Sequence, residues 1–156
     1  MKTILIQVGK TQNNHFVSCI NDYISRISHY MSFEVITIPE LKGTKHLSES
    51  QQKAKEGERI LRECHPGDTV VLLDEHGKEY RSIELASWLL KKQNIARRLI
   101  FIIGGPYGFA PEVYQRANEM LSLSKLTYSH EMVRLIFVEQ VYRACTIIKG
   151  EPYHHE

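Results

Sequence analysis

Apolar runs alternate with stretches of helical periodicity along the chain. Residues 70–73 and 99–103 are apolar at every position, which is typical of strands buried on both faces of a parallel sheet. The stretches between the runs space their apolar residues as amphipathic helices do. This order predicts an α/β fold with a mostly parallel sheet and helices on both faces. The predicted strands span residues 3–8, 33–38, 69–73 and 99–103, and the predicted helices span residues 16–27, 51–64, 83–92, 111–120 and 130–148.

The last predicted helix is apolar around most of its circumference. Ser129 suits its N-cap, as Asn13 or Asn14 suits that of the first helix, and Gly150 follows its end. A helix apolar nearly all round is buried on more than one side. We expect a second subunit to cover one side, because a helix at the chain end is rarely central to its own core. The alternative is a helix packed on the sheet with a few apolar residues exposed.

Length, composition and charge restrict the class of protein but do not identify its function. The chain has 156 residues, which suits a single domain over residues 1–156. Hydrophobic residues make up 42%, charged residues 24%, and the net charge is +2, so charge alone does not indicate a nucleic-acid binder. Three widely spaced cysteines predict free thiols in a reducing compartment. No stretch suits a secretory leader or a membrane span, so we expect a cytoplasmic protein.

The candidate ligand-binding segments are those that directly follow the buried strands, because ligands bind beyond the carboxyl ends of the strands in an open parallel sheet. Residues 74–82 follow one strand, and Gly104, Gly105 and Pro106 follow another. Two glycines there let backbone approach a ligand closely, although many turns look alike. The sequence has no GxGxxG, no P-loop and no HExxH, and no clustered Cys and His, so no metal is predicted.

Two further segments have open interpretations. The hydroxyl-rich residues 121–130 lead into the last helix, either as a ligand-binding loop or simply as its cap. Residues 39–50 are either a mobile loop near substrate or a surface connection. The basic cluster comprises Lys91, Lys92, Arg97 and Arg98, which form either a solvated face or a contact with a binding partner.

Five motifs in register carry a family resemblance. They are Leu-Leu-Asp-x-x-Gly-Lys at residues 72–78, Ile-Gly-Gly-Pro-x-Gly at 103–108, Leu-Ser-Leu-Ser-x-x-Thr with His130 and Arg134 at 121–134, Glu-Gln-x-Tyr-Arg-Ala at 139–144, and Pro-Tyr-His at 152–154. Across essentially its whole length the chain resembles the SPOUT-class methyltransferase H family of bacterial large-subunit ribosomal RNA.

This resemblance implies a C-terminal deep trefoil knot, a homodimer and S-adenosylmethionine as methyl donor. It implies methylation of N3 of a pseudouridine in 23S rRNA of the assembled ribosome, where the ribosome supplies much of the docking surface. Carried over by motif, the cofactor-binding residues are Leu73, Gly104, Gly105, Leu123, Ser124, Lys125, Leu126, Thr127 and Tyr128. Apolar side chains and hydroxyls in this set suit an adenine ring and the polar parts of the cofactor.

The resemblance also implies catalytic residues in the tail. His154 is the first candidate to accept the N3 proton, and the neighbouring Tyr153 is suited to stack on the base. The alternative is that this segment is a frayed tail without a catalytic role. Arg143 is a third catalytic candidate, or else pairs with Glu139 on the helix surface. Two further residues, His130 and Arg134, are candidates for substrate binding, with a helix-start role as the alternative for His130. Other functions considered are a non-catalytic ribosome- or RNA-binding knot protein and a metabolite-binding α/β enzyme.

Overall fold

Five parallel strands form one sheet in the order β2-β1-β4-β3-β5 in the computed structural model, which describes residues 1–155. The α/β fold and its parallel sheet confirm the prediction, and the four expected strands are present. The strands are β1 (Lys2–Val8), β2 (Ser32–Ile38), β3 (Thr69–Lys78), β4 (Arg98–Ile103) and β5 (Glu119–Leu121). The most apolar run, β4, lies at the centre of the sheet, where both faces are covered.

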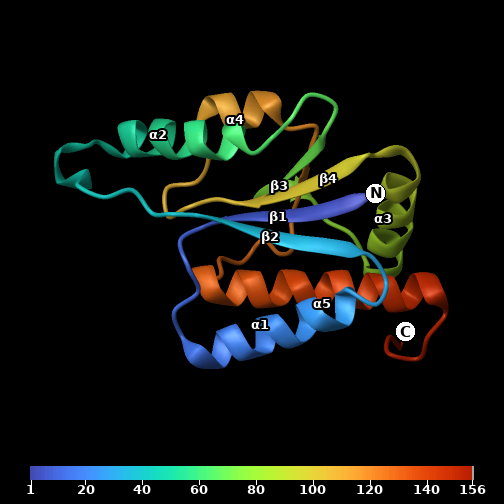
Figure 1. Cartoon of the computed structure of the whole chain (residues 1–156). Coiled ribbons are helices and arrows are strands. Elements are labelled where there is room, and N and C mark those ends of the chain that lie inside the picture. Colours follow the sequence, from blue (N-terminus) through green and yellow to red (C-terminus); the bar gives the residue numbers. More distant parts are fainter. Residues whose placement is uncertain (156) are drawn as a thin grey trace.

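Helices cover both faces of the sheet, as expected (Figure 1). One core packs α1 (Asn14–Ile27), α3 (Ser82–Ile95) and α5 (His130–Lys149) against one face, and a second core packs α2 (Glu49–Arg62) and α4 (Pro111–Arg116) against the other. A short 3-10 helix, η1 (Thr44–His46), lies in the connection between β2 and α2. None of the helices within residues 1–155 has the length and apolar character needed to cross a membrane.

Side-chain caps fix where the helices begin. Asn13 accepts a hydrogen bond from the backbone of His15 at the start of α1. Ser129 accepts one from the backbone of Met132 at the start of α5. Both caps confirm the sequence interpretation, and each satisfies a backbone N–H that has no partner inside its helix.

The expected helix over residues 111–120 is wrong in its second half. The helix α4 ends at Arg116, and Ala117 is already extended. Asn118 then bonds to Val70 twice, through its backbone N–H to the carbonyl oxygen at 2.8 Å and through its side-chain oxygen to the backbone N–H at 2.8 Å. These two bonds align the following residues beside β3, so residues 119–121 form the edge strand β5.

The last helix finds much of its cover within its own chain. It packs against the sheet, α1 and α3, and its buried apolar residues include Phe137, Val138 and Val141. Figure 1 shows α5 between the sheet and α1. Its apolar circumference therefore has a partly intramolecular explanation, while Met132 stays 37% exposed. The second subunit and the knot stay predictions.

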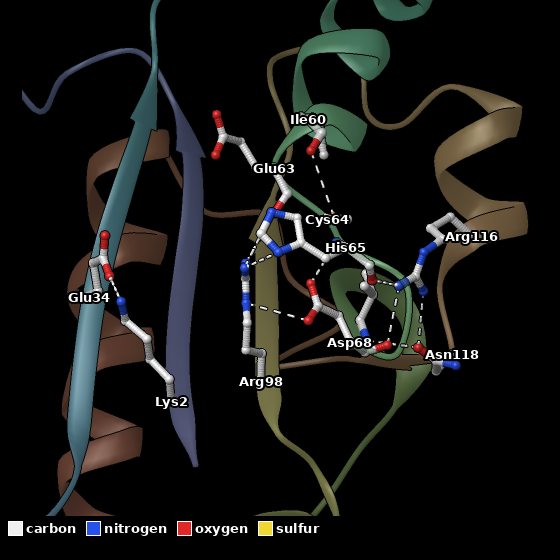
Figure 2. Close-up of polar contacts among 11 residues, drawn as sticks. Lys2, Glu34, Ile60, Glu63, Cys64, His65, Asp68, Arg98, Arg116 and Asn118 are labelled. Carbon is white, nitrogen blue, oxygen red and sulfur yellow. Dashed lines mark hydrogen bonds and ion pairs between the residues drawn. The ribbon is translucent and has the colours of Figure 1, made fainter.

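A polar cluster closes the amino-terminal end of the sheet (Figure 2). Arg98 of β4 lies between His65 and Asp68, with Nη1 2.5 Å from His65 Nδ1 and Nε 3.4 Å from Asp68 Oδ1. Arg116 of α4 donates to the backbone carbonyl oxygens of His65 and Asp68. Two members of the predicted basic cluster therefore have acidic partners: Arg98 pairs with Asp68, and Lys92 pairs with Glu119.

Candidate functional site

A pocket of about 500 Å³ opens where three chain segments meet at the carboxyl edge of the sheet, beyond the end of β4. The segments are the irregular second half of β3, after its pairing with β4 ends at Leu72, the loop after β4 and the loop before α5, so residues far apart in sequence share one wall. Every residue predicted to bind the cofactor lines this pocket except Lys125, whose ammonium group instead lies 3.6 Å from Glu79 Oε1. The predicted residues on the pocket wall are Leu73, Gly104, Gly105, Leu123, Ser124, Leu126, Thr127 and Tyr128.

Phe109 packs closely on Gly104 and leaves little room for a side chain there. A Cβ added to Gly104 would lie 3.0 Å from the Phe109 ring. The pocket thus combines apolar walls from Leu73 and Phe109, close backbone at the glycines, and hydroxyls from Ser124 and Thr127. Its volume is within the range of sites for cofactors of nucleoside size. The residues present therefore fit an adenosine-containing cofactor.

The polar side of this pocket includes Tyr114, which was not predicted. The Tyr114 hydroxyl donates to Asp74 Oδ2 at 2.6 Å, and the backbone N–H of His76 donates to Asp74 Oδ1 at 2.8 Å. Burial opposes ionisation of Asp74, but these bonds outweigh it and lower the pKa of the carboxyl. Burial, with the bond to Asp74, raises the pKa of Tyr114 to about 12. Tyr114 is on α4, away from any motif, so nothing in the sequence pointed to it.

A second pocket of about 380 Å³ adjoins the first and shares Gly105, Pro106 and His130 with it. Glu56 of α2 stands in its wall and accepts a hydrogen bond from the Gly105 backbone N–H at 3.0 Å. Burial raises the pKa of Glu56, although the Gly105 N–H opposes the shift. The connection over residues 39–50 also contributes, since Glu40, Leu41 and Thr44 line the pocket.

The first turns of α5 hold the loop between β1 and α1 in the wall of this second pocket. Arg134, only 3% exposed, donates to the Val8 carbonyl oxygen at 2.6 Å and to Thr11 Oγ1 at 2.9 Å. Glu131 Oε2 accepts from the backbone N–H groups of Gln12 and Asn13. Burial lowers the pKa of Arg134. The structure thus gives Arg134 a positioning role beside the pocket, and its contact with substrate stays a prediction.

The three predicted catalytic residues lie together at the other end of α5. Arg143 Nη1 is 3.0 Å from His154 Nδ1, and its Nη2 donates to Glu139 Oε1 at 2.6 Å. The Tyr153 hydroxyl donates to the same Glu139 oxygen at 2.9 Å, and its ring packs on Tyr142. Hydrogen bonding to Glu139 raises the pKa of Arg143. Residues 151–155 therefore fold back on α5, and Glu156 lies outside the described residues.

The tail and the pockets lie at different turns of α5. The tail contacts α5 at Glu139 and Arg143, which lie about 14–20 Å along the helix axis from His130 at the pockets. Figure 1 shows the start of α5 and the C-terminal tail at opposite ends of the molecule. The structure brings together the predicted cofactor residues, and separately the predicted catalytic residues, but does not join the two groups within one chain.

Parallel strands, a nucleoside-sized pocket at their carboxyl ends and a hydroxyl-rich loop define an α/β protein with a candidate ligand site at the edge of its sheet. Within residues 1–155, no three His, Cys, Asp or Glu side chains are grouped so that they could hold a metal ion. The family model described as a predicted SPOUT methyltransferase matches residues 1–154.

Relatives from several bacteria align over the full length of both chains. A protein of Bacteroides fragilis is 60% identical over 157 aligned residues, one of Phocaeicola vulgatus 59%, and one of Porphyromonas gingivalis 52%. Each is named ribosomal RNA large subunit methyltransferase H. The chain therefore belongs to the SPOUT methyltransferases and, among them, to the ribosomal RNA large subunit methyltransferase H family.

Proposed function

We propose that this protein is an S-adenosylmethionine-dependent methyltransferase of large-subunit ribosomal RNA. The finer proposal is methylation at N3 of a pseudouridine in 23S rRNA, on the assembled ribosome in the bacterial cytoplasm. The observation that carries it is the meeting of the predicted cofactor segments in one pocket of about 500 Å³. Membership of the methyltransferase H family supports the RNA substrate.

The pocket residues would bind and orient the methyl donor. Leu73 and Phe109 supply an apolar slot, the glycines bring backbone groups close, and Ser124 and Thr127 offer hydroxyls. When bound, the sulfonium supplies an activated methyl group. The chain's own contribution is alignment and exclusion of water, which methyl transfer needs more than acid catalysis.

The catalytic tail is proposed to act on the partner subunit of a homodimer. Within one chain, Tyr153 and His154 contact Glu139 and Arg143, about 14–20 Å along α5 from His130 at the cofactor pocket. Exposed apolar residues near the pocket support a partner there, since Leu126 is 75% and Met132 is 37% exposed. In this arrangement His154 is the candidate acceptor of the N3 proton, and Tyr153 stacks on the target base.

Calorimetry with S-adenosylmethionine and methyl incorporation into ribosomes test the activity. We expect binding, and incorporation into assembled ribosomes in preference to free 23S rRNA, with the methyl group mapped to one pseudouridine. Binding without transfer to either substrate would favour the alternative, a non-catalytic ribosome-binding protein. An absence of cofactor binding would refute the proposal.

Complementation between two inactive variants tests the tail across subunits. His154→Ala keeps the pocket and loses the tail imidazole, whereas Thr127→Trp fills the pocket and keeps the tail. In a mixed dimer, the open pocket belongs to the His154→Ala subunit and the intact tail belongs to the Thr127→Trp subunit. These two meet only if the tail acts across the interface, so mixing the variants should restore activity. An inactive mixture would contradict this arrangement, and full activity of His154→Ala alone would remove His154 from the mechanism.

A further inference from the structure

The pocket of about 380 Å³ beside the cofactor pocket is not used by the proposed binding of the methyl donor. It shares Gly105, Pro106 and His130 with the cofactor pocket, so a ligand in one pocket is a direct neighbour of a ligand in the other. A methyl acceptor needs such a position, because the reacting atoms must approach to within about 3–3.5 Å. Its volume suits a single nucleoside.

The walls of this pocket are polar and held in place. Arg134 and Glu131 fix the loop between β1 and α1, as described above, and the same loop contributes Lys10 and Gln12 to the wall. The 3-10 helix η1 contributes Thr44. Amides, a hydroxyl and carboxylates are the groups that hydrogen-bond the edge of a pyrimidine base.

Glu56 is a carboxylate in this wall that is fixed through one of its two oxygens. Its Oε1 accepts the Gly105 backbone N–H at 3.0 Å, and a Cβ added to Gly105 would lie 2.5 Å from its Oε2. Within residues 1–155, Oε2 has no hydrogen-bond donor. A half-buried carboxylate with one oxygen fixed and one free is suited to accept an N–H from a ligand.

We propose that this pocket binds the target nucleoside and that the Glu56 carboxylate accepts the N1–H of its base, which selects pseudouridine over uridine. The proposal rests on the proposed function. Pseudouridine is joined to ribose through carbon, so its N1 carries a hydrogen. Uridine presents a C–H at the same edge, which gives a carboxylate no comparable bond. The raised pKa of Glu56 is consistent with this proposal. Burial destabilises the charged carboxylate, and a ligand N–H would supply a hydrogen-bond donor that stabilises it.

The sharpest variant is Glu56→Gln. The amide oxygen still accepts the Gly105 N–H, so the fold and the cofactor pocket are kept, whereas the amide NH₂ now faces N1–H donor to donor. The matched control is Glu58→Gln on the exposed side of the same helix. The substrates are assembled ribosomes that lack the methyl group and carry either pseudouridine or uridine at the target position.

The measured quantity is the ratio of kcat/KM on pseudouridine ribosomes to that on uridine ribosomes. Wild type and Glu58→Gln should prefer pseudouridine by about tenfold or more, as expected for one charge-assisted hydrogen bond. In Glu56→Gln the ratio should fall to about one, mainly through loss on pseudouridine, with an unchanged Kd for S-adenosylmethionine. A ratio in Glu56→Gln equal to that of wild type, or no preference in wild type, would overturn the proposal.

A second pair of variants tests the location without touching Glu56. Thr44→Trp fills the pocket from η1, and His46→Trp places the same side chain on the exposed side of η1. Thr44→Trp should abolish methyl transfer to both ribosomes while S-adenosylmethionine still binds, and His46→Trp should not. Full activity of Thr44→Trp would exclude this pocket as the nucleoside site. If wild type methylates neither ribosome, the proposed function itself fails.

Discussion

Replacement of Arg134 by methionine tests how the second pocket is held together. Methionine keeps an unbranched stem of similar reach and removes the guanidinium. The substitution deletes two hydrogen bonds, to the Val8 carbonyl oxygen at 2.6 Å and to Thr11 Oγ1 at 2.9 Å. It leaves the last carbonyl of β1 without its donor, at the point where the chain enters the pocket wall.

The expected loss of stability follows from these contacts. A hydrogen bond from a charged donor contributes about 1.5–3 kcal/mol, but Thr11 is half-exposed and regains water. Burial lowers the pKa of Arg134, so removing the charge also relieves a desolvation cost. We therefore expect a net loss of about 1.5–3 kcal/mol, which for a chain of this size lowers Tm by roughly 3–12 °C.

Thermal and denaturant unfolding of wild type, Arg134→Met and Arg62→Met provides the measurement. Arg62 is exposed at the end of α2, so its replacement should change stability by less than about 0.5 kcal/mol. Arg134→Lys should be intermediate, because an ammonium group does not reproduce the two-pronged guanidinium contact. Equal midpoints for Arg134→Met and Arg62→Met would refute the reasoning that Arg134 anchors this loop.

Three further predictions concern other parts of the molecule. Gly105→Ala places a Cβ 2.5 Å from Glu56 Oε2, so we expect at least about tenfold loss of methyl transfer with the far end of the sheet unaffected; activity within about twofold of wild type would contradict the close contact. Tyr114→Phe removes the hydroxyl that donates to Asp74 and helps to lower the pKa of that carboxyl. A carboxyl whose pKa is lower in the folded than in the unfolded protein stabilises the fold above its unfolded pKa, which is about 4 for aspartate. This stabilisation is lost as the pH falls through the pKa of the folded state. The variant should thus be less stable by about 0.5–1 kcal/mol at pH 7, a difference that disappears at low pH in urea titrations; a deficit that persists in acid would argue against this account. Asp68→Ala should lower the free energy of unfolding by about 2–4 kcal/mol, because the Asp68 side chain is nearly buried against Arg98. The kcat of the folded enzyme should stay unchanged. A loss of kcat without a loss of stability would show that this cluster influences the functional site.

Local patterns in the sequence were enough for the central part of the fold and for the two strand ends that border the cofactor pocket. The run at residues 99–103 is apolar at every position, and only a central strand covered on both faces uses such a run. Gly104 and Gly105 follow that strand directly, and Leu73 ends the apolar run of β3, so the rule that parallel strands end at one edge placed them together. The hydroxyl-rich loop before α5 was recognised through the family resemblance.

Contacts between distant segments decided the rest. The strand β5 depends on Asn118 bonding to Val70, 48 residues away, and three residues are too few to show a period. Tyr114 and Glu56 reach the pockets from helices on the far side of the sheet from α5, so only packing brings them to Asp74 and Gly105.

The sequence by itself determined four of the strands, the positions of the longer helices and which segments bear ligand chemistry, because burial on one or two faces imposes a period on the residues. Only the tertiary structure showed that α5 holds the tail about 14–20 Å along its axis from the cofactor pocket and that a second pocket lies beside that pocket. Distances between segments depend on how helices pack on the sheet, and no local period records them.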